Sequence, residues 1–126
     1  MAKDARSEHA ASVVIDAALR VHSALGPGLL ESAYERALAL ELSARDVPFV
    51  TQRVLFVSYR GESIRAGRAD LVVNDRVLVE LKCVGSLEPV HVSQVIAYLR
   101  AARLRLGLLV NFNVPAIRLG IRRIVL

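Results

Sequence analysis

Two acidic residues and a lysine near the middle of the chain have a spacing that could bring two carboxylates and an ammonium group together on one surface. Asp70 precedes a polar loop at 74–76, and Glu80 and Lys82 follow it. The segments on both sides of this loop have a strand pattern, so the three together predict a β-hairpin. Successive side chains of a strand point to opposite faces, and a three-residue loop then sets Asp70 directly opposite Glu80, with Lys82 on the same face.

This arrangement favours binding of a divalent cation. Two carboxylates facing each other repel unless a cation lies between them, and hard carboxylate oxygens suit Mg²⁺ or Mn²⁺. The backbone carbonyl of Leu81 could add an oxygen ligand, and Lys82 could orient an attacking water or stabilise negative charge on a phosphodiester. The alternative is an ordinary charged strand face in which Lys82 pairs with Glu80. A register slip of one residue would also separate Asp70 from Glu80.

The hairpin lies within an α/β pattern that we interpret as one domain over residues 1–126. Helical periodicity or composition predicts helices at about 8–25, 29–45 and 89–103, and strand patterns occur at 48–61, 64–73, 77–84, 106–112 and 117–122. The order is therefore α-α-β-β-β-α-β-β, with a mixed sheet flanked by helices. The hairpin face opposite the charged trio is apolar and predicted to enter the core, with Leu71, Val73, Val77, Val79 and Leu81.

Charge is distributed unevenly along the chain. The formal net charge is +5, and residues 89–126 contain six arginines, Arg100 among them, and no acidic residue. A segment of one charge sign suits a polyanion such as nucleic acid, because arginine pairs with phosphate and releases its counterions. A solvated face or subunit contacts would explain it equally well. Aromatic residues are only 5% of the chain, which argues against a base-stacking platform for single strands.

Composition also bears on location and assembly. No segment has the roughly 20 consecutive apolar residues of a membrane span, and none resembles an export signal. The single cysteine, Cys83, excludes an internal disulfide and fits a reducing compartment, so we expect a cytoplasmic protein. Hydrophobic residues make up 54% of a small chain, and we expect part of that apolar surface to be covered in a homo-oligomer.

Several separate motifs, in order, resemble a known family. Asp70 and Glu80-Leu81-Lys82 resemble the D…ExK core of the PD-(D/E)XK nuclease superfamily, although Ala69 replaces the proline of the superfamily name. The segment 28–34 resembles the G-x-x-E-x-x-Y element of the GxxExxY family within that superfamily. The likeness continues through 94–99 to 107–112. It implies a restriction-endonuclease-like core of helix, three strands, helix and strand, around a mixed sheet.

The resemblance also implies roles for individual residues. Asp70, Glu80 and Glu31 match metal-binding acids of the site, and Lys82 matches the catalytic lysine. Gln94 and Tyr98 resemble the Gln-x-x-x-Tyr element with which some members contact phosphate or the lysine, and Tyr34 and Arg100 are further candidates for substrate binding. On physical grounds alone, Glu31 could serve only the helix dipole at the start of its helix, and the two tyrosines could be core residues.

Three functions are compatible with the sequence. The first is a nuclease that uses Mg²⁺ or Mn²⁺ to hydrolyse DNA or RNA, with the arginine-rich C-terminal segment 89–126 holding the phosphate backbone. The second is a nucleic-acid-binding module whose site is inert. The third is a structural protein whose apolar surface and arginines serve self-assembly. Cleavage of labelled DNA or RNA that depends on Asp70 and Lys82 distinguishes the first from the other two.

Overall fold

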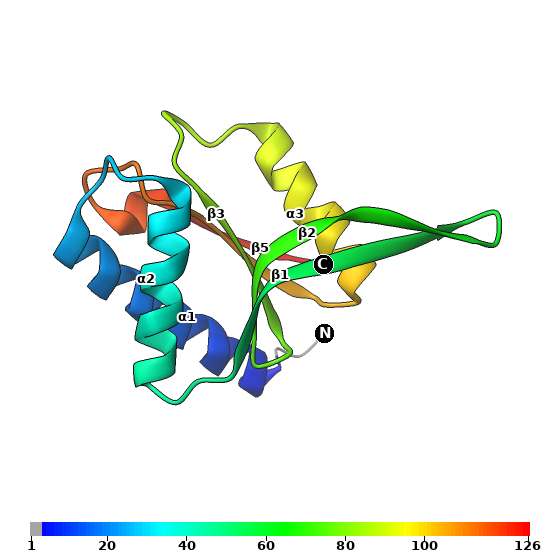
Figure 1. Ribbon diagram of the computed structural model, residues 1–126, viewed down its shortest axis with the longest axis horizontal. Coiled ribbons are helices and arrows are strands. Elements are labelled where there is room, and N and C mark those ends of the chain that lie inside the picture. Colours follow the sequence, from blue (N-terminus) through cyan, green and yellow to red (C-terminus); the bar gives the residue numbers. More distant parts are fainter. Residues whose placement is uncertain (1–3) are drawn as a thin grey trace.

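The protein, described by a computed structural model over residues 4–126, is a mixed β-sheet with helices on both faces (Figure 1). The helices are α1 (Ala5–Leu25), α2 (Glu31–Ala44), α3 (Pro89–Ala102) and a short 3₁₀ helix, η1 (Ile117–Gly120). The strands are β1 (Phe49–Tyr59), β2 (Glu62–Val73), β3 (Val77–Lys82), β4 (Leu106–Asn111) and β5 (Ile121–Val125). This order and the mixed sheet confirm the predicted α/β class. No helix of the described part is long and apolar enough to cross a membrane.

The five strands follow their chain order in one sheet, β1-β2-β3-β4-β5. Neighbours pair antiparallel except β3 and β4, which are parallel. A parallel pair needs a crossover connection, and α3 supplies it. The helix begins at a capping box in which Glu88 and His91 each accept a hydrogen bond from the backbone N–H of the other, with Pro89 in the first turn.

Each face of the sheet is covered by a separate apolar cluster. The larger cluster joins α1 and α2 to one face, and it includes the five hairpin residues predicted from alternation, Leu71, Val73, Val77, Val79 and Leu81. The smaller cluster joins α3 to the other face, through Leu55, Ala69, Val72, Leu78, Val95, Leu99, Leu109 and Ile124. The two central strands β3 and β4 are buried on both faces, apart from Lys82, as expected for the parallel part of a sheet.

The last predicted strand, at 117–122, was placed wrongly. Residues 117–120 form η1 instead, and β5 begins only at Ile121. Ile117 is buried in the larger cluster whereas Leu119 is 67% exposed, so these two residues do not share the buried strand face that alternation predicted. Gly120 lies against the backbone of β4, where a Cβ atom would be 2.1 Å from the Asn111 carbonyl oxygen. This close approach requires glycine and marks the turn into β5.

Strands β1 and β2 form a hairpin that is much longer than the other three strands of the sheet. The pairing of the two strands continues to Tyr59 and Glu62, and a register shift occurs between Leu55 and Phe56. Beyond that point the two strands project past α3 as a twisted ribbon (Figure 1). The ribbon ends in a tight turn at Arg60 and Gly61, both with positive φ.

Candidate active site

The candidate site lies where the β2–β3 ladder ends. The observed pairs are Leu71 with Val79, Val72 with Leu78, and Val73 with Val77, which is the register predicted from the loop length. Continued by one residue, this register sets Asp70 beside Glu80. At this position side-chain carboxylates, instead of backbone carbonyls, accept the hydrogen bonds of the backbone N–H groups. The Asp70 N–H donates to Glu80 Oε1 at 2.9 Å, and the Leu81 N–H donates to Asp70 Oδ2 at 2.8 Å.

An irregularity in β2 explains how the Asp70 side chain reaches the neighbouring strand. Ala69 and Val72 belong to the same cluster under α3, although residues three apart on a regular strand point to opposite faces. The alternation therefore breaks at Asp70. Gln52 of β1 faces this position, between the pairs Thr51–Leu71 and Arg53–Ala69. Its φ of 54° lies in the left-handed region. This local distortion turns the Asp70 carboxylate into the gap between β2 and β3.

Burial and like charge make the Glu80 carboxyl a weak acid. Glu80 is only 3% exposed. Burial first, and the neighbouring Asp70 charge second, raise the pKa of Glu80 from 4.5 to about 8, although the hydrogen bond from Asp70 N–H and the Lys82 charge act in the opposite direction. Near neutral pH without a cation, Glu80 therefore holds a proton much of the time. A site of this kind gains stability from a bound cation.

Two glutamates of α2 extend this acidic group. Glu31, in the first turn, and Glu35, one turn later, both have pKa values raised by desolvation and by the Asp70 charge, and Lys82 opposes the shift at Glu31. Sequence reasoning found Glu31 and missed Glu35. The spacing of four residues, which sets two side chains on one face of a helix, was the signal available.

Gln52 is a second residue that sequence reasoning missed. Its amide nitrogen donates to Glu35 and lies 3.5 Å from Asp70 Oδ1, so it connects α2 to the acidic pair. Its amide oxygen, like that of Gln94, is buried and has no hydrogen-bond partner among residues 4–126. Buried orphan acceptors are rare, and both occur in residues beside the carboxylates or on the facing helix α3.

Gln94 and Tyr98 come from α3, where they share one face at a spacing of four residues. The Gln94 amide lies 3.4 Å from the Tyr98 hydroxyl. The ring of Tyr98 covers Gly67 of β2, where an added Cβ atom would be 2.4 Å from the hydroxyl oxygen. Glycine at this position therefore lets α3 pack closely against β2, three residues before Asp70. Gln94 could reach the site only with α3 this close to the strand.

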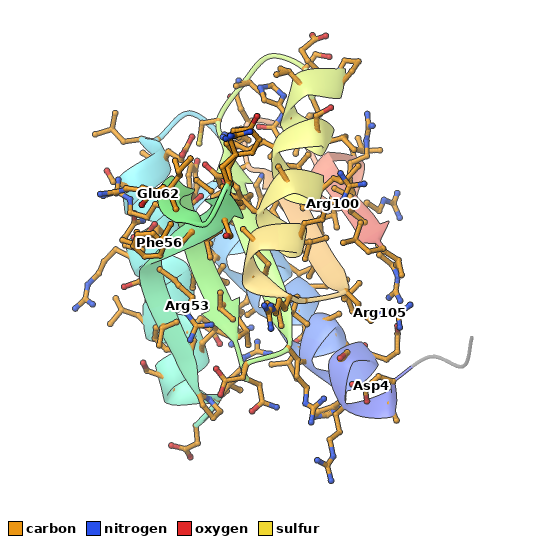
Figure 2. All side chains as sticks on the ribbon, turned by 90° about the vertical axis from the view of Figure 1, so that its right-hand side faces the viewer. Asp4, Arg53, Phe56, Glu62, Arg100 and Arg105 are labelled. Carbon is orange, nitrogen blue, oxygen red and sulfur yellow. The ribbon has the colours of Figure 1, made fainter. Side chains whose placement is uncertain are left out.

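The structure buries Tyr34 and places Arg100 on an exposed side of α3. Tyr34 has no exposed area, and its ring stacks on Phe112 at 4.4 Å between centroids. The Tyr34 hydroxyl donates to the Gly26 carbonyl and accepts from Leu29 N–H, so it fixes the turn before α2 instead of binding substrate. Arg100 is exposed and, two residues from Tyr98, points to the opposite side of α3 (Figure 2).

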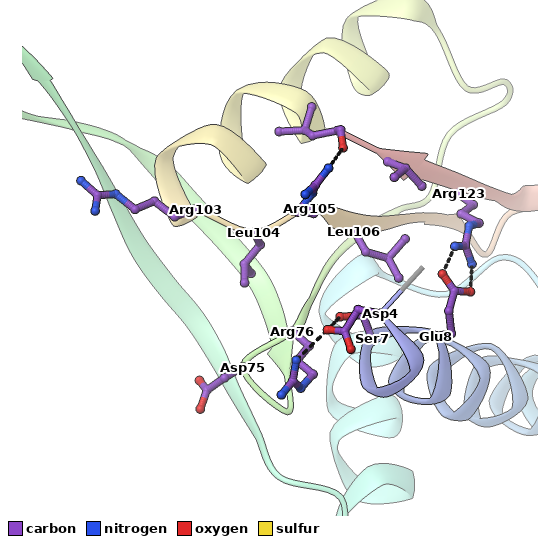
Figure 3. A pocket seen from close by; sticks show the side chains of 12 residues that line it. Asp4, Ser7, Glu8, Asp75, Arg76, Arg103, Leu104, Arg105, Leu106 and Arg123 are labelled. Atoms are coloured by element: carbon purple, nitrogen blue, oxygen red, sulfur yellow. Dashed lines mark hydrogen bonds and ion pairs between the residues drawn. The ribbon is translucent and has the colours of Figure 1, made fainter. Parts of the chain in front are cut away.

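Three of the arginines near the C-terminus lie away from the carboxylates. Arg103, Arg105 and Arg123 line a cavity of about 630 Å³ at the Val77 end of β3, opposite the Lys82 end (Figure 3). Arg123 pairs with Glu8 of α1, and Arg105 donates to the Leu126 carbonyl. Glu8, near the start of the chain, thus compensates part of the charge that looked uniform in sequence.

The residues present fit a small hard cation held largely by water. Within residues 4–126 no three His, Cys, Asp or Glu side chains are grouped closely enough to form a metal cage. Mg²⁺ does not need such a cage, since one or two carboxylates and several waters commonly suffice. Asp70, Glu80 and the Leu81 carbonyl are the groups that would supply such oxygen ligands, and Glu31 is near enough for electrostatic interaction with the two carboxylates.

Comparison with known proteins agrees with this geometry. No curated protein and no solved structure matches the chain. The profile of the PD-(D/E)XK nuclease superfamily matches residues 8–124. This range contains the four acidic residues and the lysine of the candidate site, Glu31, Glu35, Asp70, Glu80 and Lys82. The five-stranded mixed sheet with three α-helices is consistent with the restriction-endonuclease-like core of that superfamily. The chain belongs to the PD-(D/E)XK nuclease superfamily.

Proposed function

We propose that this protein is a metal-dependent nuclease that hydrolyses phosphodiester bonds of nucleic acid. The observation that carries the proposal lies at the end of the β2–β3 ladder away from the loop, where Asp70 and Lys82 are partly exposed, and we refer to it as the open end. There the Asp70 N–H donates to the Glu80 carboxylate and the Leu81 N–H donates to the Asp70 carboxylate. Lys82 lies close enough to interact electrostatically with Glu80 and Glu31. Superfamily membership supports the activity, and the geometry supports these positions as its site.

Each residue has a role that its position allows. Asp70, Glu80 and the Leu81 carbonyl would hold Mg²⁺ or Mn²⁺, and Glu31 would complete the acidic side of the site. The ion would neutralise charge developing on the phosphoryl group and lower the pKa of the attacking water. The Lys82 ammonium orients that water or stabilises the same charge.

Other side chains position the site or meet the substrate. Gln94 and Tyr98 of α3 offer an amide and a hydroxyl for a phosphate oxygen. Gln52 holds Glu35 and Asp70 in place through its amide nitrogen. The orphan amide oxygen of Gln94 leaves an acceptor for a water or substrate hydroxyl.

We assign the chain to the GxxExxY group of the superfamily on the basis of the turn before α2. Gly28 has a φ of 102°, which favours glycine, and the Tyr34 hydroxyl bonds to both sides of this turn, at Gly26 and Leu29. The glycine and the tyrosine thereby fix the start of α2, where Glu31 projects toward the carboxylates. In this interpretation the glycine and the tyrosine of the motif serve to position its glutamate, Glu31.

The test is cleavage of labelled DNA and RNA, in linear and circular forms, with Mg²⁺, Mn²⁺ or EDTA. We expect cleavage with either metal, none in EDTA, and a loss of at least about 10²-fold in Asp70→Asn and in Lys82→Ala. Asp46→Asn, at an exposed loop position, is the matched control and should retain full activity. Thermal unfolding of each variant excludes misfolding. Cleavage that persists in EDTA, or that both active-site variants retain, contradicts the proposal.

A further inference from the structure

The projecting part of the β1–β2 hairpin presents a basic face next to the carboxylates. Residues 53–68 contain four arginines and one glutamate. On one face of the ribbon the cross-strand pairs are Val54 with Arg68, Phe56 with Arg65, and Ser58 with Ser63. All six side chains are exposed, so this face is not part of either apolar cluster. We refer to these six residues as the ribbon face.

The ribbon face lies away from α3 and begins at the active site. The opposite face of the same strands carries Leu55 and Gly67, which pack under α3 and its Tyr98. Figure 2 shows Phe56 on the side of the hairpin away from α3. At its inner end Arg68 interacts electrostatically with Glu35. The inner end of the ribbon face therefore lies beside Glu35, one of the acidic residues that surround Asp70.

We propose that the ribbon face is the substrate-binding arm, and that its occupant is a DNA duplex; this inference rests on the proposed nuclease function. The positive charge of the arm complements a phosphate backbone, and arginine pairs with phosphate in two-pronged geometry. The major groove of B-form DNA admits a two-stranded β-ribbon, whereas that of A-form RNA is too deep and narrow for side chains to read. Phe56, 54% exposed between arginines, offers an apolar contact for a thymine methyl group or a base step.

A single strand fits the ribbon face less well. Sequence-tolerant binding of single strands uses several aromatic side chains in succession, and Phe56 is the one aromatic residue on this face. The other exposed aromatic of the hairpin, Tyr59, belongs to the opposite face. The pattern of isolated aromatic and flanking arginines suits the groove and backbone of a duplex.

The length of the hairpin sets the length of duplex that it can follow. From Asp70 the strand β2 runs back nine residues to the turn at Gly61. At about 3.3 Å per residue this is roughly 30 Å, or about nine base pairs of duplex. We expect the affinity of duplexes to rise until about nine base pairs extend beyond the cleaved phosphate on one side, and then to level off.

The experiment measures binding apart from cleavage. Fluorescence anisotropy follows a labelled 30-base-pair DNA duplex across a salt series, with Ca²⁺ in place of Mg²⁺. The double variant Arg65→Ala/Arg68→Ala should bind about tenfold more weakly at 150 mM salt, with a salt slope reduced by about two. Phe56→Ala should bind several-fold more weakly with the slope unchanged. The matched control, Arg118→Ala/Arg122→Ala, removes two exposed arginines near the opposite edge of the sheet and should stay within twofold of the wild type.

Binding of other nucleic acids, together with the number of subunits in solution, shows which ligand occupies the ribbon face. A DNA single strand or an RNA duplex of the same sequence should bind at least fivefold more weakly than the DNA duplex, and tighter binding of either overturns the assignment. If the double variant Arg65→Ala/Arg68→Ala binds DNA as well as the control does, the proposed arm is contradicted. If it changes the oligomeric state in light scattering, the proposed arm is also contradicted, and the hairpin is instead an interface between copies of the chain.

The arm and the nuclease proposal can fail separately. Arm-dependent duplex binding without cleavage in Mg²⁺ or Mn²⁺ supports the arm and contradicts the nuclease. Cleavage by Arg65→Ala/Arg68→Ala with unchanged kcat/KM contradicts the arm and supports the nuclease. Thermal unfolding and light scattering of each variant accompany both measurements.

Discussion

The two ends of the β2–β3 hairpin differ in what accepts the backbone hydrogen bonds. Next to the loop, residues 71–73 pair with 77–79 as a regular ladder, and none of these side chains is more than 1% exposed. At the other end the N–H groups of Asp70 and Leu81 donate to carboxylates instead of carbonyls. Both ends follow from one register.

The change of acceptor changes what the structure needs. A carbonyl satisfies a donor without adding charge, so the loop end can be dry and closed. A buried carboxylate satisfies the same donor but brings charge into a place that disfavours it, and the pKa of Glu80 is raised accordingly. The fold thus secures the hairpin at one end and, at the other, maintains a charged group that a cation would stabilise. The next three predictions test this division.

The largest expected effect is the loss of stability on truncating the closed end. Leu71 has no exposed surface and packs between the sheet and the helices α1 and α2. Leu71→Ala should lower the free energy of unfolding by about 3 kcal/mol, because it removes buried apolar area and leaves a cavity. Urea denaturation measures this. Leu30→Ala, at a side chain 76% exposed, should change stability by less than about 0.5 kcal/mol, and equal losses would contradict a closed apolar end.

The open end should make stability depend on pH when no metal is present. Folding raises the pKa of Glu80 to about 8 from 4.5, so the folded protein binds a proton more tightly than the unfolded chain. The stabilisation is complete below about pH 4.5 and is lost as pH rises toward 8, with a slope approaching about 1.4 kcal/mol per pH unit. Glu31 and Glu35, whose pKa values are also raised, add to the slope with the same sign.

Urea denaturation between pH 5 and 8 in EDTA tests the pH dependence. Glu80→Gln keeps the size of the side chain and removes its charge, so its stability should decline less steeply with pH than that of the wild type. Glu62→Gln, at the exposed turn of the hairpin, should retain the wild-type slope. Saturating Mn²⁺ should flatten the wild-type curve, since the cation stabilises the ionised carboxylates. Parallel curves for wild type and Glu80→Gln would show that the open end carries no buried charge.

The regular end was predictable from sequence because it follows from alternation alone. Leu71, Val73, Val77 and Val79 alternate about a loop of fixed length, so their register was predicted correctly, and it sets Asp70 beside Glu80. The break in alternation at Asp70 was not predicted. Alternation also misled at 117–122, where Gly120 has to lie against β4 and the chain turns in η1. A local pattern cannot indicate such a contact with a distant strand.

The site was less predictable because it depends on irregular backbone and distant contacts. Gln52 has a positive φ, which glutamine seldom adopts and which no motif marks, and its contact with Glu35 joins separate elements. Arg123 looked free because its partner, Glu8, is distant in sequence. The site residues found in advance were those named by a family resemblance or by strand parity, and their catalytic roles await the cleavage assay.

The smallest expected effect concerns the backbone of Gln52 beside the open end. A residue with a side chain costs about 1 kcal/mol in the left-handed region, whereas glycine does not. Gln52→Gly and Gln52→Ala both remove the amide that contacts Glu35 and lies near Asp70, so the difference between them isolates the backbone. We expect Gln52→Gly to be about 1 kcal/mol more stable than Gln52→Ala in urea denaturation, and both to cleave nucleic acid more slowly than wild type. Equal stabilities would mean that the backbone at Gln52 is relaxed, and full activity in both would show that Asp70 needs no support from β1. If the glycine variant gains stability while activity falls, the strain at Gln52 is a cost of holding the Asp70 carboxylate between the strands.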